Sequence, residues 1–354
     1  MLLNELKKRN VPDFLPESAE KWPEKRLEIV DALQKYMYGY QPPKCDITVE
    51  DVKPDPKCYG SKCNRYDVTL CCHLPEGDFR FPVIGIIPKR EKPVPAIVFI
   101  SFSDLIPSKN LPGEEITDHG VAVFSFFYKD VCPDTADAMI TGKLPLMLYG
   151  ENRKETDAGA ISLWAWAASR VLDWVLTFDE IQKDNIAVIG QSRLGKTALV
   201  AAALDERFAM AHSNESGCCG AAISRGKVGE NFEFITRTFP HWFSSGFLKY
   251  AGKEEELPFD QDQLIAAIAP RRAYASSAWE DKWADPESEF LACWSAGRVW
   301  EMLGMDGFIA PNRFPKPGEV FNLGNVGYHV RPGTHTMNRD DWKNLLPFIL
   351  RKSQ

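Results

Sequence analysis

The stretch Ile186-Ala-Val-Ile-Gly190-Gln191-Ser192-Arg193-Leu194-Gly195-Lys196 decides the fold of this chain. Its first four residues are a short apolar run that predicts a buried strand, and a helix is expected at 192–204. A serine between a strand and a helix, with small residues on either side, is typical of a nucleophile elbow. In such an elbow a sharp turn holds the serine in a strained backbone conformation. The pattern is G-x-S-x-x-G, so the second glycine comes one residue later than in G-x-S-x-G.

The segments on either side of this stretch alternate between strand and helix. Ala96–Ser101 and Val121–Phe127 are continuous apolar runs, which predict strands that are buried on both faces. Alternating strands and helices predict an α/β fold with a mostly parallel central sheet between two layers of helices. The other expected elements are strands at 186–189, 209–214 and 273–278, and helices at about 159–178 and 339–352.

The N-terminal quarter of the chain has a different pattern. Residues Pro23 to Tyr40 predict a helix, with proline at its start and Pro42-Pro43 beyond its end. Short alternating segments from Asp46 to Pro88 predict antiparallel strands at the edge of the sheet. No linker rich in Gly, Ser or Pro divides the chain. We therefore expect one catalytic domain over 1–354, with a helix and edge strands at 1–90 and the core at 91–354.

Composition excludes several classes of function. Lys and Arg number 42 and Asp and Glu number 49, which gives a net charge of −7 and argues against binding to nucleic acid. The longest apolar runs fall far short of the roughly 20 residues that span a bilayer. Met1–Asn10 lacks the apolar segment of a secretory signal. The sequence as it stands therefore predicts a cytoplasmic protein, or a secreted one if a leader has been removed.

The nine cysteines show no repeated C-x-x-C spacing of the kind that binds zinc. We expect buried, reduced thiols. A disulfide among Cys45, Cys58, Cys63 and Cys71 remains an alternative.

A serine nucleophile needs a base, and the base needs an acid that orients it. In α/β-hydrolases the order along the chain is serine, acid, histidine. His335 lies in a turn before the final helix, where this fold delivers its histidine. His329 lies on the preceding strand-like segment and is expected to be structural, and His212 and His241 come too early in the chain.

Two carboxylates are candidates for the acid. Glu215 follows the strand at 209–214, and Asp281, with Glu280 beside it, follows the strand at 273–278. Both therefore lie at the carboxyl ends of strands, where open α/β sheets keep their sites. The order of elements in the fold favours the later position, Asp281.

Taken together, the motifs of this chain resemble the glucuronoyl esterases of carbohydrate esterase family 15, especially the bacterial branch. The resemblance covers nearly the whole chain, including Tyr38-Gly39 and the helix with Trp164 and Trp166. The motifs that carry it are Gly190–Lys196, Asn214–Gly217, Arg225 with Gly229-Glu230, Pro240–Phe243, Leu257–Asp260, Ile268–Arg271, Trp283–Pro286, and Gly327–His329 through Gly333–His335.

The resemblance implies a role for each candidate in the reaction. Ser192 would be the nucleophile, His335 the general base, and the guanidinium of Arg193 part of the oxyanion hole. Glu215 matches the usual acid of the family, and Asp281 matches a position where some members carry an alternative or supplementary acid. Resemblance and strand order thus favour different acids, and we rank Glu215 first.

The resemblance also implies which residues bind the substrate. Lys196, Glu230 and Trp283 match positions that hold the hydroxyls of a sugar ring, and no metal or organic cofactor is expected. Many members carry a histidine after the Leu-Pro-Phe-Asp-Gln run, whereas this chain has Asp262, an extra acid if that loop packs near the site.

The expected activity is that of a serine esterase which cleaves esters of (4-O-methyl-)glucuronic acid through an acyl-enzyme. Such esters join glucuronoxylan side chains to lignin alcohols. The expected partners are glucuronic acid esters or glucuronoxylan fragments, with no nucleic acid and no membrane, and the expected oligomeric state is a monomer. The alternatives are an esterase that acts on acetyl or feruloyl groups of sugars and a non-catalytic carbohydrate-binding relative.

Overall fold

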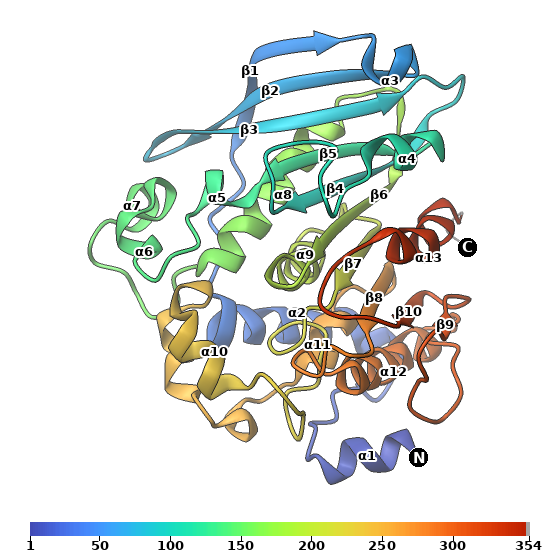
Figure 1. Ribbon diagram of the computed structural model, residues 1–354. Helices are drawn as coiled ribbons and strands as arrows, with labels where there is room; N and C mark the ends of the chain where they lie inside the picture. Colours follow the sequence, from blue (N-terminus) through green and yellow to red (C-terminus); the bar gives the residue numbers. More distant parts are fainter. Residues whose placement is uncertain (352–354) are drawn as a thin grey trace.

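One ten-stranded sheet runs through the computed structural model, which describes residues 1–351 (Figure 1). The strand order is β1-β2-β3-β5-β4-β6-β7-β8-β10-β9. The central strands from β5 to β10 pair in parallel, as the alternation of strands and helices predicted. Their bounds are β4 Val94–Ser101, β5 Ala122–Phe127, β6 Ile181–Gln191, β7 Met210–Asn214, β8 Arg272–Ala278 and β10 Val326–Arg331.

The apolar run of β4 shows why these strands lie in the middle of the molecule. Val98 and Ile100 pack into the larger hydrophobic core, on one face of the sheet. Ile97 and Phe99 pack into the smaller core on the other face. Successive side chains of a strand point to opposite faces, so a run that is apolar at every position is buried on both.

The edges of the sheet are antiparallel. At one end of the sheet lie β1 (Asp46–Asp55), β2 (Cys63–Leu74) and β3 (Gly77–Pro88), which confirms the strands expected between residues 46 and 88. β3 pairs antiparallel with β5 and so joins this edge to the parallel strands. At the other end a two-residue strand that was not predicted, β9 (Val320–Phe321), pairs with β10.

Helices cover both faces, which gives the expected three layers. The larger core lies under α2 (Trp22–Leu33), α8 (Ala160–Val175), α9 (Arg193–Leu204), α11 (Gln261–Ala266) and α12 (Pro286–Met302). The smaller core lies under α4 (Gly113–Asp118) and α13 (Arg339–Leu350). Short helices complete the described chain: α1 Leu2–Lys8, α3 Cys58–Ser61, α5 Tyr128–Val131, α6 Ala138–Thr141, α7 Lys143–Tyr149 and α10 Phe232–Thr238.

The expected helices are present, with small changes at their ends. The one expected at 23–40 is α2, continued by a π-helical turn at Gln34–Tyr38. The last expected helix corresponds to α13, and residue 352 lies outside the described residues. Within residues 1–351, no helix is at once long enough and apolar enough to cross a bilayer.

All nine cysteines are free thiols, and Cys45 alone is partly exposed. The alternative of a disulfide among Cys45, Cys58, Cys63 and Cys71 is therefore not what the structure shows.

Candidate active site

Ser192 lies on a sharp turn between β6 and α9. Its φ is 56° and its ψ −126°, a region in which a residue with a Cβ is strained. Its amide donates to the carbonyl oxygen of Asn214 at 2.8 Å, which ties the turn to the end of β7. At Gly190 a Cβ would lie 2.0 Å from the carbonyl oxygen of Leu194. The turn therefore requires glycine at 190, and it presents the serine hydroxyl at the start of a helix.

The late second glycine, Gly195, has a separate role in the fold. A Cβ there would lie 2.9 Å from Ser213 Oγ and 3.2 Å from the carbonyl oxygen of Asn214. Gly195 thus allows the first turn of α9 to pack closely against β7. The G-x-S-x-x-G spacing is compatible with an elbow because each glycine relieves a different close contact.

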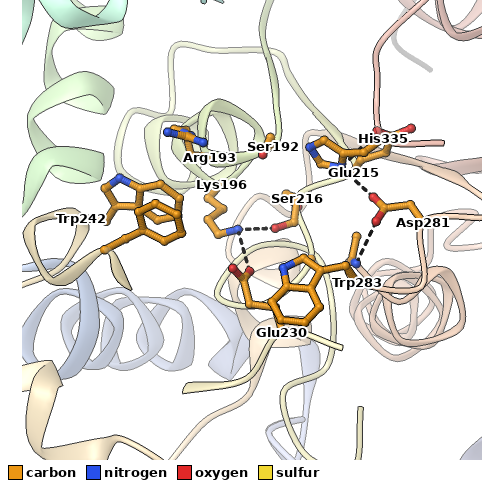
Figure 2. A pocket seen from close by; sticks show the side chains of 13 residues that line it. Ser192, Arg193, Lys196, Glu215, Ser216, Glu230, Trp242, Asp281, Trp283 and His335 are labelled. Carbon is orange, nitrogen blue, oxygen red and sulfur yellow. Dashed lines mark hydrogen bonds and ion pairs between the residues drawn. The ribbon is translucent and has the colours of Figure 1, made fainter. Parts of the chain in front are cut away.

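His335 lies in the turn between β10 and α13, and its side chain lines the same pocket as Ser192. Its Nδ1 lies 2.6 Å from Asp281 Oδ2 and 3.4 Å from Glu215 Oε2. An ionised carboxylate can only accept, so Nδ1 carries the proton in the neutral ring and Nε2 keeps a lone pair. In Figure 2 the imidazole lies between Ser192 and Asp281, with its other nitrogen on the side of the serine. The ring is positioned to act as a base.

The two carboxylates beside His335 lie in different surroundings. Asp281 follows β8 and accepts from the amide of Ala284 at 3.2 Å. Glu215 follows β7, is 1% exposed, and accepts from Arg331 Nη2 at 2.5 Å. Burial raises the pKa of Glu215, and the Arg331 guanidinium opposes that rise. Of the two acids, Asp281 is the nearer to His335, although Glu215 was ranked first from the sequence.

Arg193 is the first residue of α9, and its side chain is fixed by Asp134. Its guanidinium forms an ion pair with Asp134 and lies 4.7 Å from the ring centre of Trp242. Asp134 also accepts from His241 Nε2 at 2.8 Å and from Trp242 Nε1 at 2.7 Å. Burial opposes ionisation of Asp134, but these hydrogen bonds and the charge of Arg193 hold its pKa well below the usual range. The guanidinium is thus restrained in the lining of the pocket that Ser192 also lines.

The opposite side of the site carries polar groups and an aromatic face. Lys196 is buried, donates to the carbonyl oxygen of Ser216 at 2.5 Å and lies 3.8 Å from Glu230 Oε2. Trp283 is 49% exposed and packs edge-on against Phe234, with ring centres 4.8 Å apart. A large exposed indole beside a buried cation and a carboxylate suits a ligand with one apolar face and several hydroxyls.

These side chains surround one pocket of about 270 Å³ (Figure 2). It lies at the carboxyl ends of β6, β7 and β8, where open α/β sheets bind their ligands. Its lining comprises Ser192, Arg193, Lys196, Glu215, Ser216, Gly217, Glu230, Phe239, Trp242, Asp281, Trp283, Ala284 and His335.

The structure brings together all eight residues that were assigned to the site from the sequence. Phe239 and Trp242 also line the pocket; they stack on each other at 3.9 Å. Trp242 belongs to a motif that was noted, but no role was assigned to it. Asp134 and Arg331 were missed altogether. Asp134 acts on Arg193, 59 residues away, so no local pattern points to it. Arg331 acts on Glu215, 116 residues away, and on main-chain carbonyl oxygens of its own turn, which carry no side-chain signal in the sequence.

Three other candidates lie away from the pocket. His329 is buried and bonds to Asp341 at 2.9 Å, in keeping with the structural role expected for it. His212 is buried against Ser276, and burial lowers its pKa to about 3. Asp262 bonds to Ser295 of α12 and does not line the pocket.

One set of side chains in the pocket could also contact a metal ion. Donor atoms of Glu215, Asp281 and His335 all lie within 4.8 Å of one another. An ion at that point would have to break the hydrogen bond between His335 and Asp281. The three residues fit an acid–base arrangement as they stand.

A family model and several known proteins are similar to this chain. The family model described as "Glucuronyl esterase, fungi" matches residues 77–304. A carbohydrate esterase of an unknown prokaryotic organism is 47% identical over 190 residues, which are 54% of this chain and 44% of that protein. A 4-O-methyl-glucuronoyl methylesterase of Podospora anserina is 31% identical over 301 residues, with coverage of 81% and 58%. The chain thus spans about half the length of these curated relatives.

Solved structures match over nearly the full length. A glucuronoyl esterase from Solibacter usitatus superposes with a TM-score of 0.83 at 31% identity, over 96% of this chain and 98% of that one. A family 15 esterase described as promiscuous, from a marine bacterial metagenome, gives 0.84 at 29%, with coverage of 96% and 97%. The expected fold class is confirmed by these matches.

Proposed function

Because the chain belongs to the glucuronoyl esterase family, carbohydrate esterase family 15, we propose that it is a serine esterase that hydrolyses esters of (4-O-methyl-)D-glucuronic acid. The observation that carries the proposal is the contact of His335 Nδ1 with Asp281 at 2.6 Å, in the pocket where Ser192 stands on its strained turn. This arrangement provides a nucleophile, a base and an orienting acid.

The first half of the reaction makes an acyl-enzyme. Ser192 Oγ attacks the ester carbonyl carbon and gives its proton to His335 Nε2. The carbonyl oxygen becomes an oxyanion, which the Arg193 guanidinium and its backbone amide at the start of α9 stabilise. The intermediate then collapses. The carbon–oxygen bond to the alcohol breaks, and the leaving alcohol takes the proton from His335.

The second half releases the acid. A water molecule gives a proton to His335 and attacks the acyl carbon, again through an oxyanion beside Arg193. Collapse breaks the bond to Ser192 Oγ, which recovers its proton from His335. The product is a uronic acid, and no cofactor takes part in any step.

The side of the pocket opposite Arg193 supports a sugar ring as the acid part of the ester. Lys196 can donate to a ring hydroxyl, the Glu230 carboxylate can accept from one, and the Trp283 indole offers a face to the ring. The buried, 3.8 Å pairing of Lys196 with Glu230 keeps both groups in place before a sugar binds.

The proposal is tested by hydrolysis of benzyl and methyl glucuronate, benzyl galacturonate and p-nitrophenyl acetate. We expect the glucuronate esters to give the highest kcat/KM. Hydrolysis of the acetate alone would contradict the uronate proposal and favour an acetyl esterase. Feruloyl arabinose tests the other acyl group in the same way.

A second comparison separates an enzyme from a sugar-binding relative. Ser192→Ala should abolish turnover of benzyl glucuronate and retain binding of glucuronate, measured by calorimetry. The matched control is Ser224→Ala, since Ser224 is a buried serine outside the pocket lining. Unchanged turnover in Ser192→Ala would exclude this nucleophile.

The pocket holds a nucleophile, a base and an orienting acid, which supports a monomer as the active form. The single sheet that joins residues 46–88 to the parallel strands supports one catalytic domain over the chain.

A further inference from the structure

We infer that Arg331 is a positioning residue of this site, which fixes both the turn that carries His335 and the carboxylate of Glu215. The inference rests on the proposed function, since it assumes that His335 acts as the base. Arg331 does not line the pocket, so its effect would pass through His335 and Glu215.

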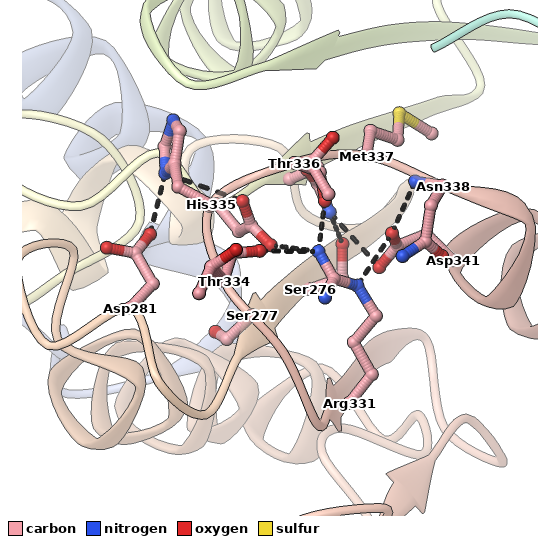
Figure 3. Close-up of polar contacts among 12 residues, drawn as sticks. Ser276, Ser277, Asp281, Arg331, Thr334, His335, Thr336, Met337, Asn338 and Asp341 are labelled. Carbon is pink, nitrogen blue, oxygen red and sulfur yellow. Dashed lines mark hydrogen bonds and ion pairs between the residues drawn. The ribbon is translucent and has the colours of Figure 1, made fainter. Parts of the chain in front are cut away.

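Arg331 is the last residue of β10 and is 4% exposed. Its Nη1 donates to the carbonyl oxygen of Pro332 at 3.0 Å, and its Nη2 donates to that of Thr334 at 3.1 Å and to that of Thr336. Thr334 and Thr336 are the two neighbours of His335 in the chain. One guanidinium therefore holds the backbone on both sides of the histidine (Figure 3).

The same guanidinium reaches the second carboxylate of the site. Nη2 donates to Glu215 Oε1 at 2.5 Å, and the other oxygen, Oε2, lies 3.4 Å from His335 Nδ1. Because one carboxylate oxygen is anchored, the direction of the other is fixed. The Arg331 guanidinium thus fixes the positions of both His335 and Glu215.

The far side of Arg331 is anchored in the body of the protein. Its Nε donates to Asp341 Oδ2 at 2.9 Å, and the same oxygen accepts from the amide of Asn338 at the start of α13. Asp341 also bonds to His329 of β10 at 2.9 Å. Two buried carboxylates, Glu215 and Asp341, thus flank the guanidinium of Arg331.

The conformation of Gly333 is independent evidence that the turn packs closely against the Arg331 side chain. Its φ is 105°, and a Cβ there would lie 2.9 Å from Arg331 Nη1. The turn also has a support that does not involve Arg331, because the amide of Glu280 donates to the carbonyl oxygen of Gly333 at 3.1 Å. The chain can therefore fold with a weaker side chain at 331, while His335 loses its fixed position.

The test compares Arg331→Lys with Arg272→Lys. Arg272 is also buried and also donates to main-chain carbonyl oxygens, at Phe348 and Arg351, but it lies at the start of β8, at the other end of that strand from Asp281. With benzyl glucuronate we expect Arg331→Lys to lower kcat by on the order of ten- to a hundredfold and to change KM less than threefold. Arg272→Lys should keep kcat. Equal kcat values for the two variants would overturn the inference.

A second measurement does not depend on the substrate class. Phenylmethylsulfonyl fluoride sulfonylates an activated serine, so its rate of reaction with Ser192 reports on His335 whatever ester the enzyme prefers. We expect slower sulfonylation in Arg331→Lys and an unchanged rate in Arg272→Lys. If the parent reacts with the sulfonyl fluoride but not with glucuronate esters, the proposed substrate fails and the role of Arg331 is still tested.

A further variant covers the case in which Arg331→Lys does not fold. Gly333→Ala removes no charge but places a methyl group against Arg331 Nη1. We expect the same pattern, with reduced kcat and sulfonylation rate and a retained KM. Parent-like values for both rates in folded Gly333→Ala would overturn the inference.

Discussion

At the scale of single residues, the unusual feature is that one nitrogen of His335 faces two carboxylates from different strands. Asp281 makes the short contact of 2.6 Å, and Glu215 lies at 3.4 Å with its other oxygen committed to Arg331. The nearer acid orients the imidazole more strongly than the more distant one, whose other oxygen is bonded to Arg331. We therefore expect Asp281 to carry most of the orientation.

The first prediction ranks the two acids. Asp281→Asn should lower kcat/KM on benzyl glucuronate by about a hundredfold or more, because an amide can hold the wrong tautomer of the histidine. Glu215→Gln should cost less, about tenfold, because the amide oxygen can still accept from Arg331. The measurement is steady-state kinetics of both single variants and the double variant. A larger loss in Glu215→Gln would make Glu215 the principal acid.

At this scale the sequence indicated which residues belong to the site, but not which side chains contact one another. Ser192, Lys196 and Trp283 were found because each belongs to a motif with a known place in a fold. Strand order favoured Asp281 and the family resemblance favoured Glu215, which was ranked first. The 0.8 Å difference between their two contacts with His335 depends on how β7 and β8 end relative to one another, which no local pattern records. Asp134 was missed because its partner Arg193 is 59 residues away in the chain.

At the scale of elements, α11 and α12 are packed together through a buried acid. Asp262 of α11 is 0% exposed and accepts from Ser295 of α12 at 2.6 Å, while its other oxygen has no hydrogen-bond partner. Burial, with the charge of Asp260, raises the pKa of Asp262 to about 7. The folded state therefore favours the protonated form of this side chain.

The second prediction follows from the sign of that shift. The pKa of an unfolded aspartate is about 3.9, so the unfolded chain ionises first and folding loses stability as the pH rises from about 4 to about 7. Asp262→Asn removes this loss. The unfolding free energy of this variant, relative to that of the parent, should increase by about 2 kcal/mol from pH 5 to pH 8. Urea denaturation at both pH values measures the difference.

The matched control is Asp137→Asn, because Asp137 is exposed before α6. Its stability relative to the parent should stay the same at both pH values. A gain in Asp262→Asn that does not grow with pH would contradict the proposed protonation of the buried carboxyl.

The elements themselves were predicted with uneven success, and α12 shows why. The strands of the parallel sheet and the helices α8, α9 and α13 were expected from apolar runs and spacing. α12, with 17 residues, was not. It is buried on most of its surface, including polar residues such as Glu289 and Ser295, so it lacks the polar face that marks a surface helix.

At the scale of the whole molecule, the parallel strands gather distant parts of the chain at one edge of the sheet. The general arrangement could be predicted, because strands that alternate with helices must place their carboxyl ends together. The strand order could not be predicted. The reversed order of β5 and β4 in the sheet and the added strand β9 depend on pairings that no local pattern records.

The third prediction concerns the thiols of the folded chain. Cys45 is partly exposed, and a hydrogen bond with Cys72 lowers its pKa to about 7, whereas the other eight cysteines are buried. Brief treatment with iodoacetamide at pH 7.5 should therefore alkylate Cys45 first, with a rate that increases as the pH rises through about 7. Peptide mass spectrometry identifies the labelled residue.

Two further results check this assignment. Cys45→Ser should resist brief alkylation, and all nine thiols of the parent should react after denaturation. Labelled parent should retain its esterase activity, since Cys45 does not line the pocket. Early labelling of Cys58 or Cys218 would contradict the burial described for them.

The pair of acids around His335 has a consequence for how such enzymes diverge. Because either carboxylate can contact the imidazole, we expect each single change to leave a slower but working catalyst. Under that expectation, a lineage can exchange one acid for the other through active intermediates. Descendants of a chain like this one would be free to keep either acid, and the discarded position would become open to new uses.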